Sequence, residues 1–240
     1  MRVPASRIAI VLFLSAMTAW ADPTLYHDNK KAVLYVGGGA PPIDGTVQDW
    51  DGLKGSSPQV FVFGGYKGPQ DPSAVFVLRS DNKKLFIYAE VIDSIANENE
   101  LPAPIAWRND SVEIFIGTDT RSHVNFASGD NQIRLVPVSR KNIHAIGVSV
   151  NDLIVDTEKD VEGAVVYTDK GYRIVAAIPL RLLRIKGFKP GQPIRCEFQI
   201  NDATTGEREN LVHWKSKKDD PYCDASAWGD GVVEAMPGDR

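Results

Sequence analysis

The sequence contains few of the residues that most often carry enzyme chemistry. Among its 240 residues there are two cysteines, three methionines and four histidines. The histidines are scattered without the spacing of a metal site, and neither G-x-S-x-G nor H-E-x-x-H occurs. Met236 is the one methionine of the expected mature chain, which argues against haem ligation by methionine. No motif marks a carboxylate pair for glycoside cleavage either, so we expect a protein without glycosidase or lyase activity.

Long apolar runs are missing beyond the N-terminus. Residues 1–21 have the pattern of a cleavable secretory signal peptide, in which Arg2 and Arg7 flank the start of an apolar run and Ala19-Trp20-Ala21 matches the cleavage site. No later stretch approaches the roughly 20 apolar residues that cross a bilayer. We therefore expect a secreted or periplasmic protein, with no stable insertion into a membrane.

An excess of positive charge is also absent. The chain has 27 basic and 31 acidic residues and a formal charge of −4, which becomes −6 when Arg2 and Arg7 leave with the signal. A mildly acidic chain without a basic cluster binds nucleic acids and anionic membranes poorly. We expect no nucleic-acid partner.

The two cysteines, Cys196 and Cys223, leave two alternatives open. In an oxidising compartment they could form a disulfide, or they could be two separate buried thiols. The sequence does not supply the Cα separation that would decide between them.

Short β-branched and aromatic runs, bounded by turn residues, fill residues 22–240. They recur at a spacing typical of a single antiparallel β-sandwich domain. Asp169-Lys170-Gly171 predicts a tight hairpin turn, and Pro179–Leu183 is the one expected helical turn. The predicted strands are 33–36, 59–63, 74–79, 85–93, 110–116, 132–138, 143–150, 162–168, 172–178, 195–201, 211–214 and 231–235.

Side-chain alternation along three of these runs predicts one polar sheet face. In 195–201, apolar Cys196, Phe198 and Ile200 alternate with Glu197, Gln199 and Asn201, and in 110–116 and 132–138 the polar sets include Glu113 and Arg134. Carboxylates, amides and guanidinium groups together supply the donors and acceptors that sugar hydroxyls need. A merely hydrated outer face would show the same pattern.

The positions of the aromatic residues favour a sugar site over a hydrated face. Trp107 stands just before the 110–116 strand, and Tyr222 stands in the loop 219–227. A flat aromatic ring packs on the apolar face of a pyranose, as in many concave ligand sites. Trp50 and Trp214 are expected in the core.

Six blocks of the chain, in order, resemble one known family. They are Pro42-Ile43-Asp44-Gly45 with Trp50, the run from Leu85 to Val91 with Asp93, the run from Trp107 to Phe115, the run from Gly171 to Pro179, the run from Phe198 to Ala203, and Trp214 with Asp224 to Gly229. In this order they resemble the family 9 carbohydrate-binding modules found attached to xylanases.

The resemblance implies a jelly-roll β-sandwich, sugar binding and structural calcium. It places two aromatic rings, Trp107 and Tyr222, around a terminal sugar, although better-known members have Trp at the second position. The remaining matching positions are the polar ligands Glu113, Arg134, Gln199 and Asn201, with Arg208 as a further candidate. Possible calcium ligands are Asp44, Asp49, Asp51, Asp93 and Asp110.

The sequence therefore predicts a non-catalytic carbohydrate-binding protein whose ligand is a mono-, oligo- or polysaccharide. It would work alone or beside a glycoside hydrolase. The alternative is a sandwich of the same fold that has lost sugar binding and docks another protein.

Overall fold

The computed structural model describes residues 26–27, 30–68, 70–204 and 206–238. The expected signal peptide, residues 1–21, lies outside them. All twelve predicted strands are present: β2 (Ala32–Val36), β4 (Val60–Phe63), β5 (Ser73–Ser80), β6 (Lys84–Ile92), β7 (Ser111–Gly117), β8 (Asn131–Pro137), β9 (Ile146–Val150), β11 (Glu162–Thr168), β12 (Gly171–Pro179), β13 (Pro193–Ala203), β14 (Arg208–His213) and β15 (Gly229–Ala235). Three two-residue strands add to them: β1 (Tyr26–His27), β3 (Lys54–Gly55) and β10 (Leu153–Ile154).

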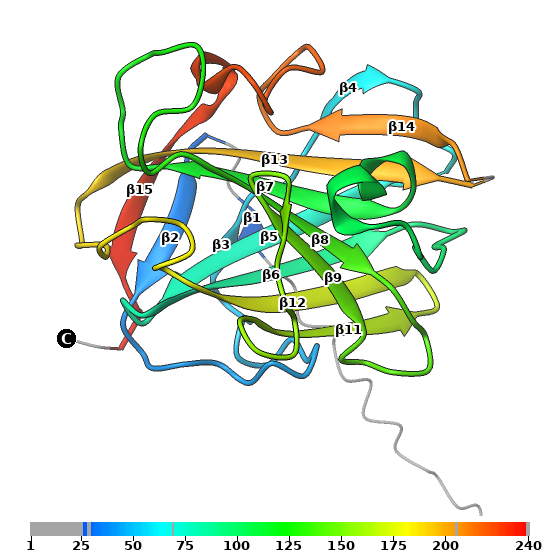
Figure 1. The fold of residues 1–240 in the computed structure, drawn as a ribbon, viewed down its shortest axis with the longest axis horizontal. Helices are drawn as coiled ribbons and strands as arrows, with labels where there is room; N and C mark the ends of the chain where they lie inside the picture. The colour runs from blue at the N-terminus through cyan, green and yellow to red at the C-terminus, as the bar shows by residue number, and fades with distance from the viewer. Residues whose placement is uncertain (1–25, 28–29, 69, 205, 239–240) are drawn as a thin grey trace, which may run out of the picture.

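The strands form a β-sandwich in which one sheet curls so that its two halves face each other (Figure 1). Its order is β10-β9-β8-β7-β13-β15-β2-β5-β6-β12-β11, with β14 and β4 added beside β13. In Figure 1 the strands β7, β8 and β9 cross in front of β5, β6 and β12. Most pairs are antiparallel as expected, but β2 runs parallel to both of its neighbours, β15 and β5. β2 therefore connects the half of the sheet that contains β7, β8, β9 and β13 to the half that contains β5, β6 and β12.

The main core lies between the two halves and follows the predicted alternation. Ile114 of β7 and Ile133 of β8 belong to the same buried cluster as Ile87 of β6 and Ile174 of β12. Each apolar set turns inward because successive side chains of a strand point to opposite faces. The opposite faces of β7, β8 and β13 are therefore free to carry polar groups.

The turns and loops differ from the predictions in one respect. The hairpin turn is confirmed: Thr168 pairs with Gly171, whose φ of 146° and close approach to the Val91 carbonyl leave no room for a Cβ. The predicted helical turn at Pro179–Leu183 is present only as turns: the backbone nitrogens of Leu182, Leu183 and Arg184 donate to carbonyls three residues earlier, but no regular helix forms. The turns end at Arg184, which has a left-handed φ of 54°. The 3₁₀ helices of the described chain lie in other loops, η1 (Ala103–Arg108) and η2 (Ala225–Ala227), which were not predicted.

The buried and exposed side chains test two further predictions. Trp50 and Trp214 are core residues as expected, being 0% and 3% exposed. The disulfide alternative is wrong, because both cysteines of the described chain are free thiols. Cys196 points into the core from β13, and its burial raises the pKa of the thiol, whereas Cys223 lies exposed in a loop. Strand alternation thus turns Cys196 toward the core, away from the surface where Cys223 lies.

Candidate functional site

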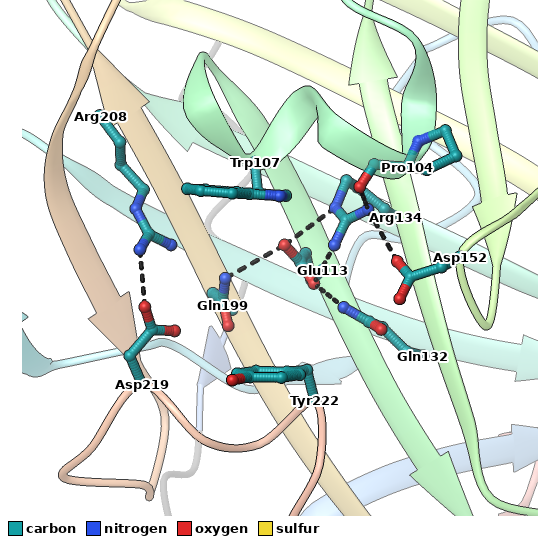
Figure 2. Close-up of a pocket in the computed structure, with 10 residues that line it drawn as sticks. All are labelled: Pro104, Trp107, Glu113, Gln132, Arg134, Asp152, Gln199, Arg208, Asp219 and Tyr222. Atoms are coloured by element: carbon teal, nitrogen blue, oxygen red, sulfur yellow. Dashed lines mark hydrogen bonds and ion pairs between the residues drawn. The ribbon is translucent and has the colours of Figure 1, made fainter.

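A pocket of about 340 Å³ opens on the outer face of β7, β8 and β13 (Figure 2). The 3₁₀ helix η1 borders it on one side, and the loop between β14 and η2 borders it on the other. It is lined by Pro104, Trp107, Glu113, Gln132, Arg134, Asp152, Gln199, Arg208, Asp219 and Tyr222. Six of the seven ligand residues predicted from the sequence are in this set, and only Asn201 is not.

Strand register brings the polar floor of the pocket together. Gln199 of β13 pairs directly with Glu113 of β7, and Glu113 pairs with Arg134 of β8. Residues directly opposite on neighbouring antiparallel strands have Cβ atoms about 4.5–5.5 Å apart. The three side chains therefore form a row across three strands, although 86 positions separate Glu113 from Gln199.

Glu113 is the centre of a buried hydrogen-bond network. Its carboxylate accepts from Arg134 Nε at 3.0 Å and Nη2 at 3.2 Å. It also accepts from Gln132 Nε2 at 2.5 Å, Gln199 Nε2 at 3.1 Å and Asn201 Nδ2 at 2.9 Å. A buried carboxylate needs such compensation, because an unpaired buried charge costs several kcal/mol. The network holds the polar groups in fixed directions at the bottom of the pocket.

Arg134 also positions the first aromatic wall. Its Nη1 donates to the carbonyl oxygens of Ala103 at 2.9 Å and Pro104 at 2.8 Å, both in η1. Trp107 stands in the last turn of the same 3₁₀ helix. The guanidinium therefore connects the floor of the pocket to the element that carries Trp107.

Tyr222 forms the opposite wall. Figure 2 shows both rings nearly edge-on, Trp107 above and Tyr222 below, with Glu113 and Gln199 between them. The backbone beside Tyr222 is held by the buried Trp228, whose Nε1 donates to the Pro221 carbonyl at 3.0 Å. Tyr222 is 55% exposed, so it is available to a ligand.

Arg208 and Asn201 complete the site in different ways. Arg208 Nη2 forms an ion pair of 2.6 Å with Asp219, and its guanidinium lies 4.9 Å from the Trp107 ring centroid. Asn201 lies on the same face of β13 as Gln199, two residues further along the strand, and its Oδ1 accepts from Gln199 and Arg208. Asn201 therefore positions pocket residues and does not itself line the pocket.

Comparisons with known proteins agree on one family. The family model described as carbohydrate family 9 binding domain-like matches residues 43–235. The chain belongs to this family. Among curated proteins, the chain is similar to endo-1,4-beta-xylanase A of Thermotoga neapolitana, with 26% identity over 80% of this chain. It is also similar to endo-1,4-beta-xylanase C of Paenibacillus barcinonensis, with 29% identity over 62% of this chain. The chain spans only 17% and 12% of the lengths of these enzymes.

Solved structures of family 9 modules share the fold. A module from Caldicellulosiruptor kristjanssonii in complex with cellotriose has a TM-score of 0.66 and 22% identity, covering 87% of this chain and 96% of that one. The complex of a family 9 module from the same organism with glucose has a TM-score of 0.65 and 23% identity, covering 87% and 98%. At this identity the likeness establishes the β-sandwich.

Four residues of this family 9 pocket were not among the predicted ligands: Pro104, Gln132, Asp152 and Asp219. Gln132 could have been predicted as a pocket residue from strand alternation, because it shares the outward face of β8 with Arg134. Asp152 and Asp219 lie in loops, where no periodic pattern indicates direction. His213, also unpredicted, lies beside Gln199 on the neighbouring strand β14, with its Nε2 3.0 Å from Gln199 Oε1.

A second polar cluster lies outside the pocket and bears on calcium. Asp93 and Asp110, two of the five candidate ligands, come together with Asp202, and one ligand oxygen of each lies within 4.8 Å of the others. All three are buried. Asp44, Asp49 and Asp51 are not in this group; Asp44 instead accepts a turn hydrogen bond from Thr46 N at 2.9 Å.

The cluster gathers negative charge in a buried place. Burial, followed by the charge of Asp93, raises the pKa of Asp110 to about 8. Lys67 neutralises part of this charge through an ion pair of 2.9 Å with Asp202 Oδ2. Asp202 Oδ1 is buried and has no hydrogen-bond partner among the described residues. Three carboxylates with an unpartnered oxygen fit the oxygen-rich coordination of calcium.

The described part of the chain contains no helix long and apolar enough to span a bilayer.

Proposed function

We propose that the chain is a non-catalytic carbohydrate-binding module that holds a sugar between Trp107 and Tyr222. The observation that carries this proposal is the placement of the two rings on opposite walls of one pocket, with the Glu113 network as the floor between them (Figure 2). Aromatic walls suit the apolar faces of a pyranose ring, and the floor suits its hydroxyl edge.

Each side chain has a distinct part in this binding mode. Trp107 and Tyr222 pack on the two faces of the ring. Sugar hydroxyls would compete for the hydrogen bonds that Glu113 now accepts from Arg134 and Gln199, so that Glu113 accepts from the sugar while Arg134 and Gln199 donate to it. Arg208 extends the donor set at the edge. Few apolar atoms are buried and water bonds are exchanged for protein bonds, so we expect dissociation constants of roughly micromolar to millimolar.

The relatives suggest the kind of sugar and the setting. Family 9 structures in complex with glucose and cellotriose support a neutral, glucose-type ligand. Matches to two xylanases support a role alongside a glycoside hydrolase. Together with the signal-like residues 1–21, these matches support action in the periplasm or the medium.

We further propose that Asp93, Asp110 and Asp202 hold a structural calcium ion. The ion would offset the mutual repulsion of three buried carboxylates and use the unpartnered Asp202 Oδ1. Asp110 also accepts from the backbone nitrogens of Asn97 at 2.6 Å and Ala203 at 2.8 Å. Calcium would thus stabilise the segment that follows β6 and the end of β13.

Calorimetric titration of the mature protein with glucose, xylose, cellobiose and cellotriose, with and without calcium, tests the sugar site. We expect saturable binding that falls at least tenfold in Trp107→Ala and several-fold in Tyr222→Ala. Tyr66→Ala is a matched control, because Tyr66 is 57% exposed, close to the 55% of Tyr222, but lies outside the pocket. Unchanged affinity in Trp107→Ala would contradict the aromatic clamp. No response of the folded wild type to any sugar would favour the protein-docking alternative.

A further inference from the structure

Asp152 reaches the pocket from a turn with an unusual backbone. It joins β9 to β10 as the second of two turn residues, Asn151 and Asp152, which have φ values of 51° and 60°. Left-handed conformations are uncommon outside glycine, and two-residue hairpins of this kind favour Asn-Gly. An aspartate at the second position gives up the freedom of glycine, and its carboxylate lines the pocket instead.

Neighbouring strands hold this turn in place. The side chain of Asn151 accepts from the backbone nitrogen of Gln132 at 2.9 Å and donates to Asn131 Oδ1 at 3.2 Å. Gln132 is itself a pocket residue that binds Glu113. The position of Asp152 is therefore tied to the floor of the pocket, and Figure 2 shows its carboxylate at the rim beside Arg134 and Pro104.

The side chains that line the pocket carry one more negative than positive charge, and Asp152 carries the unbalanced one. Arg134 is matched by Glu113, and Arg208 is matched by Asp219. Five charged side chains line the pocket, of which three are acidic and two are basic. Among the described residues Asp152 has one charged partner, Arg134 Nη1 at 3.4 Å, a nitrogen that already donates to two carbonyl oxygens. The side chain remains 62% exposed.

We propose that Asp152 determines the charge selectivity of the pocket, so that neutral and amino sugars are accepted and sugars carrying a carboxylate are disfavoured. The inference rests on the proposed sugar-binding function and adds the class of sugar that is refused. An acidic sugar would bring a second negative charge next to Asp152 without a free guanidinium to receive it. At about 7 Å and an effective dielectric constant of about 40, one such repulsion corresponds to roughly a five- to tenfold change in affinity.

The test compares glucose, glucuronic acid and glucosamine by calorimetry at pH 6 and low ionic strength, using wild type, Asp152→Asn and Glu162→Gln. The last variant is the control: it removes one exposed negative charge, paired with Lys84 at 2.5 Å, outside the pocket. We expect wild type to bind glucuronic acid several-fold more weakly than glucose. In Asp152→Asn the affinity for glucuronic acid should approach the affinity for glucose. Any tighter binding of glucosamine than of glucose should become smaller in this variant. Glu162→Gln should behave as wild type.

The outcomes separate this inference from the function on which it rests. If glucose binds and the glucuronic acid to glucose ratio is the same in wild type and Asp152→Asn, the charge selectivity is overturned and the sugar site stands. The same conclusion follows if Glu162→Gln shifts the ratio equally. If folded wild type binds none of the three sugars, the proposed function fails and this inference fails with it.

Discussion

The Glu113–Arg134 pair provides the most direct test of how the pocket is built. The two side chains are 2% and 4% exposed, and their nearest atoms, Arg134 Nε and Glu113 Oε1, are 3.0 Å apart. Replacing Glu113 by glutamine keeps the shape but leaves the Arg134 charge without its partner. The new amide NH₂ would also face donors from Gln132, Gln199 and Asn201, which now bond to the carboxylate.

The expected magnitude follows from this geometry. Breaking a buried ion pair by removing one partner costs about 3–5 kcal/mol, because the remaining charge stays desolvated. We expect Glu113→Gln to lower the free energy of unfolding by about 3 kcal/mol. Arg134→Met also loses the bonds to Ala103 and Pro104, so we expect a similar loss. The double variant should cost clearly less than the two single losses together.

Urea unfolding of wild type, both single variants and the double variant measures this coupling, and calorimetry with glucose follows the site in parallel. We expect a coupling of about 2 kcal/mol and a loss of glucose affinity of about tenfold or more in each single variant. Single losses that add within about 0.5 kcal/mol would refute the network. Single losses below about 1 kcal/mol would show that water reaches the pair in solution.

Two pH-dependent predictions follow from other buried groups. Burial and the charge of Asp93 raise the pKa of Asp110 to about 8, so the folded metal-free protein keeps a proton that the unfolded chain releases above about pH 4. Its stability should fall as pH rises from 4 to 8, and the gain in Tm on adding calcium should be larger at pH 8 than at pH 6; an equal gain would contradict the site. Burial lowers the pKa of His213 to about 4, so the unfolded chain binds a proton first as pH falls below about 6.5. Between pH 7 and pH 4.5 wild type should lose about 2 kcal/mol more unfolding free energy than His213→Asn, and parallel urea curves for the two proteins would exclude this effect.

Much of the fold was predictable because polar and apolar residues alternate along each strand, and this alternation can be read from a short stretch of sequence. A period of two in β7, β8 and β13 separates Val112, Ile114 and Ile133 from Glu113 and Arg134, whatever lies elsewhere in the chain. All twelve predicted strands are present for this reason, and the inner and outer faces of these three are as expected. The turn that follows Pro179 was predictable because proline is tolerated at the start of a helical turn.

The candidate site was predictable in part from strand pattern, which indicates Glu113, Arg134 and Gln199, and in part from family resemblance, which adds Trp107, Arg208 and Tyr222. Glu113, Arg134 and Gln199 are found in the pocket with Trp107 and Tyr222. Asn201 was assigned to the same face correctly, but it is buried and does not line the pocket, since Arg208 of the neighbouring strand β14 bonds to it. Strand periodicity predicts the sheet face to which a side chain points, but not how deeply that side chain is buried.

The sequence by itself determined the β-rich fold and its polar face, because these depend on residue type and on short-range alternation, and family resemblance indicated the aromatic pair. The tertiary structure decided which distant groups meet. It separated Cys196 from Cys223, brought Asp202 to Asp93 and Asp110, and placed Asp152 and Asp219 at the pocket rim. Loop positions and cross-strand register are set by contacts between segments far apart in the chain, and no local pattern of residues encodes them.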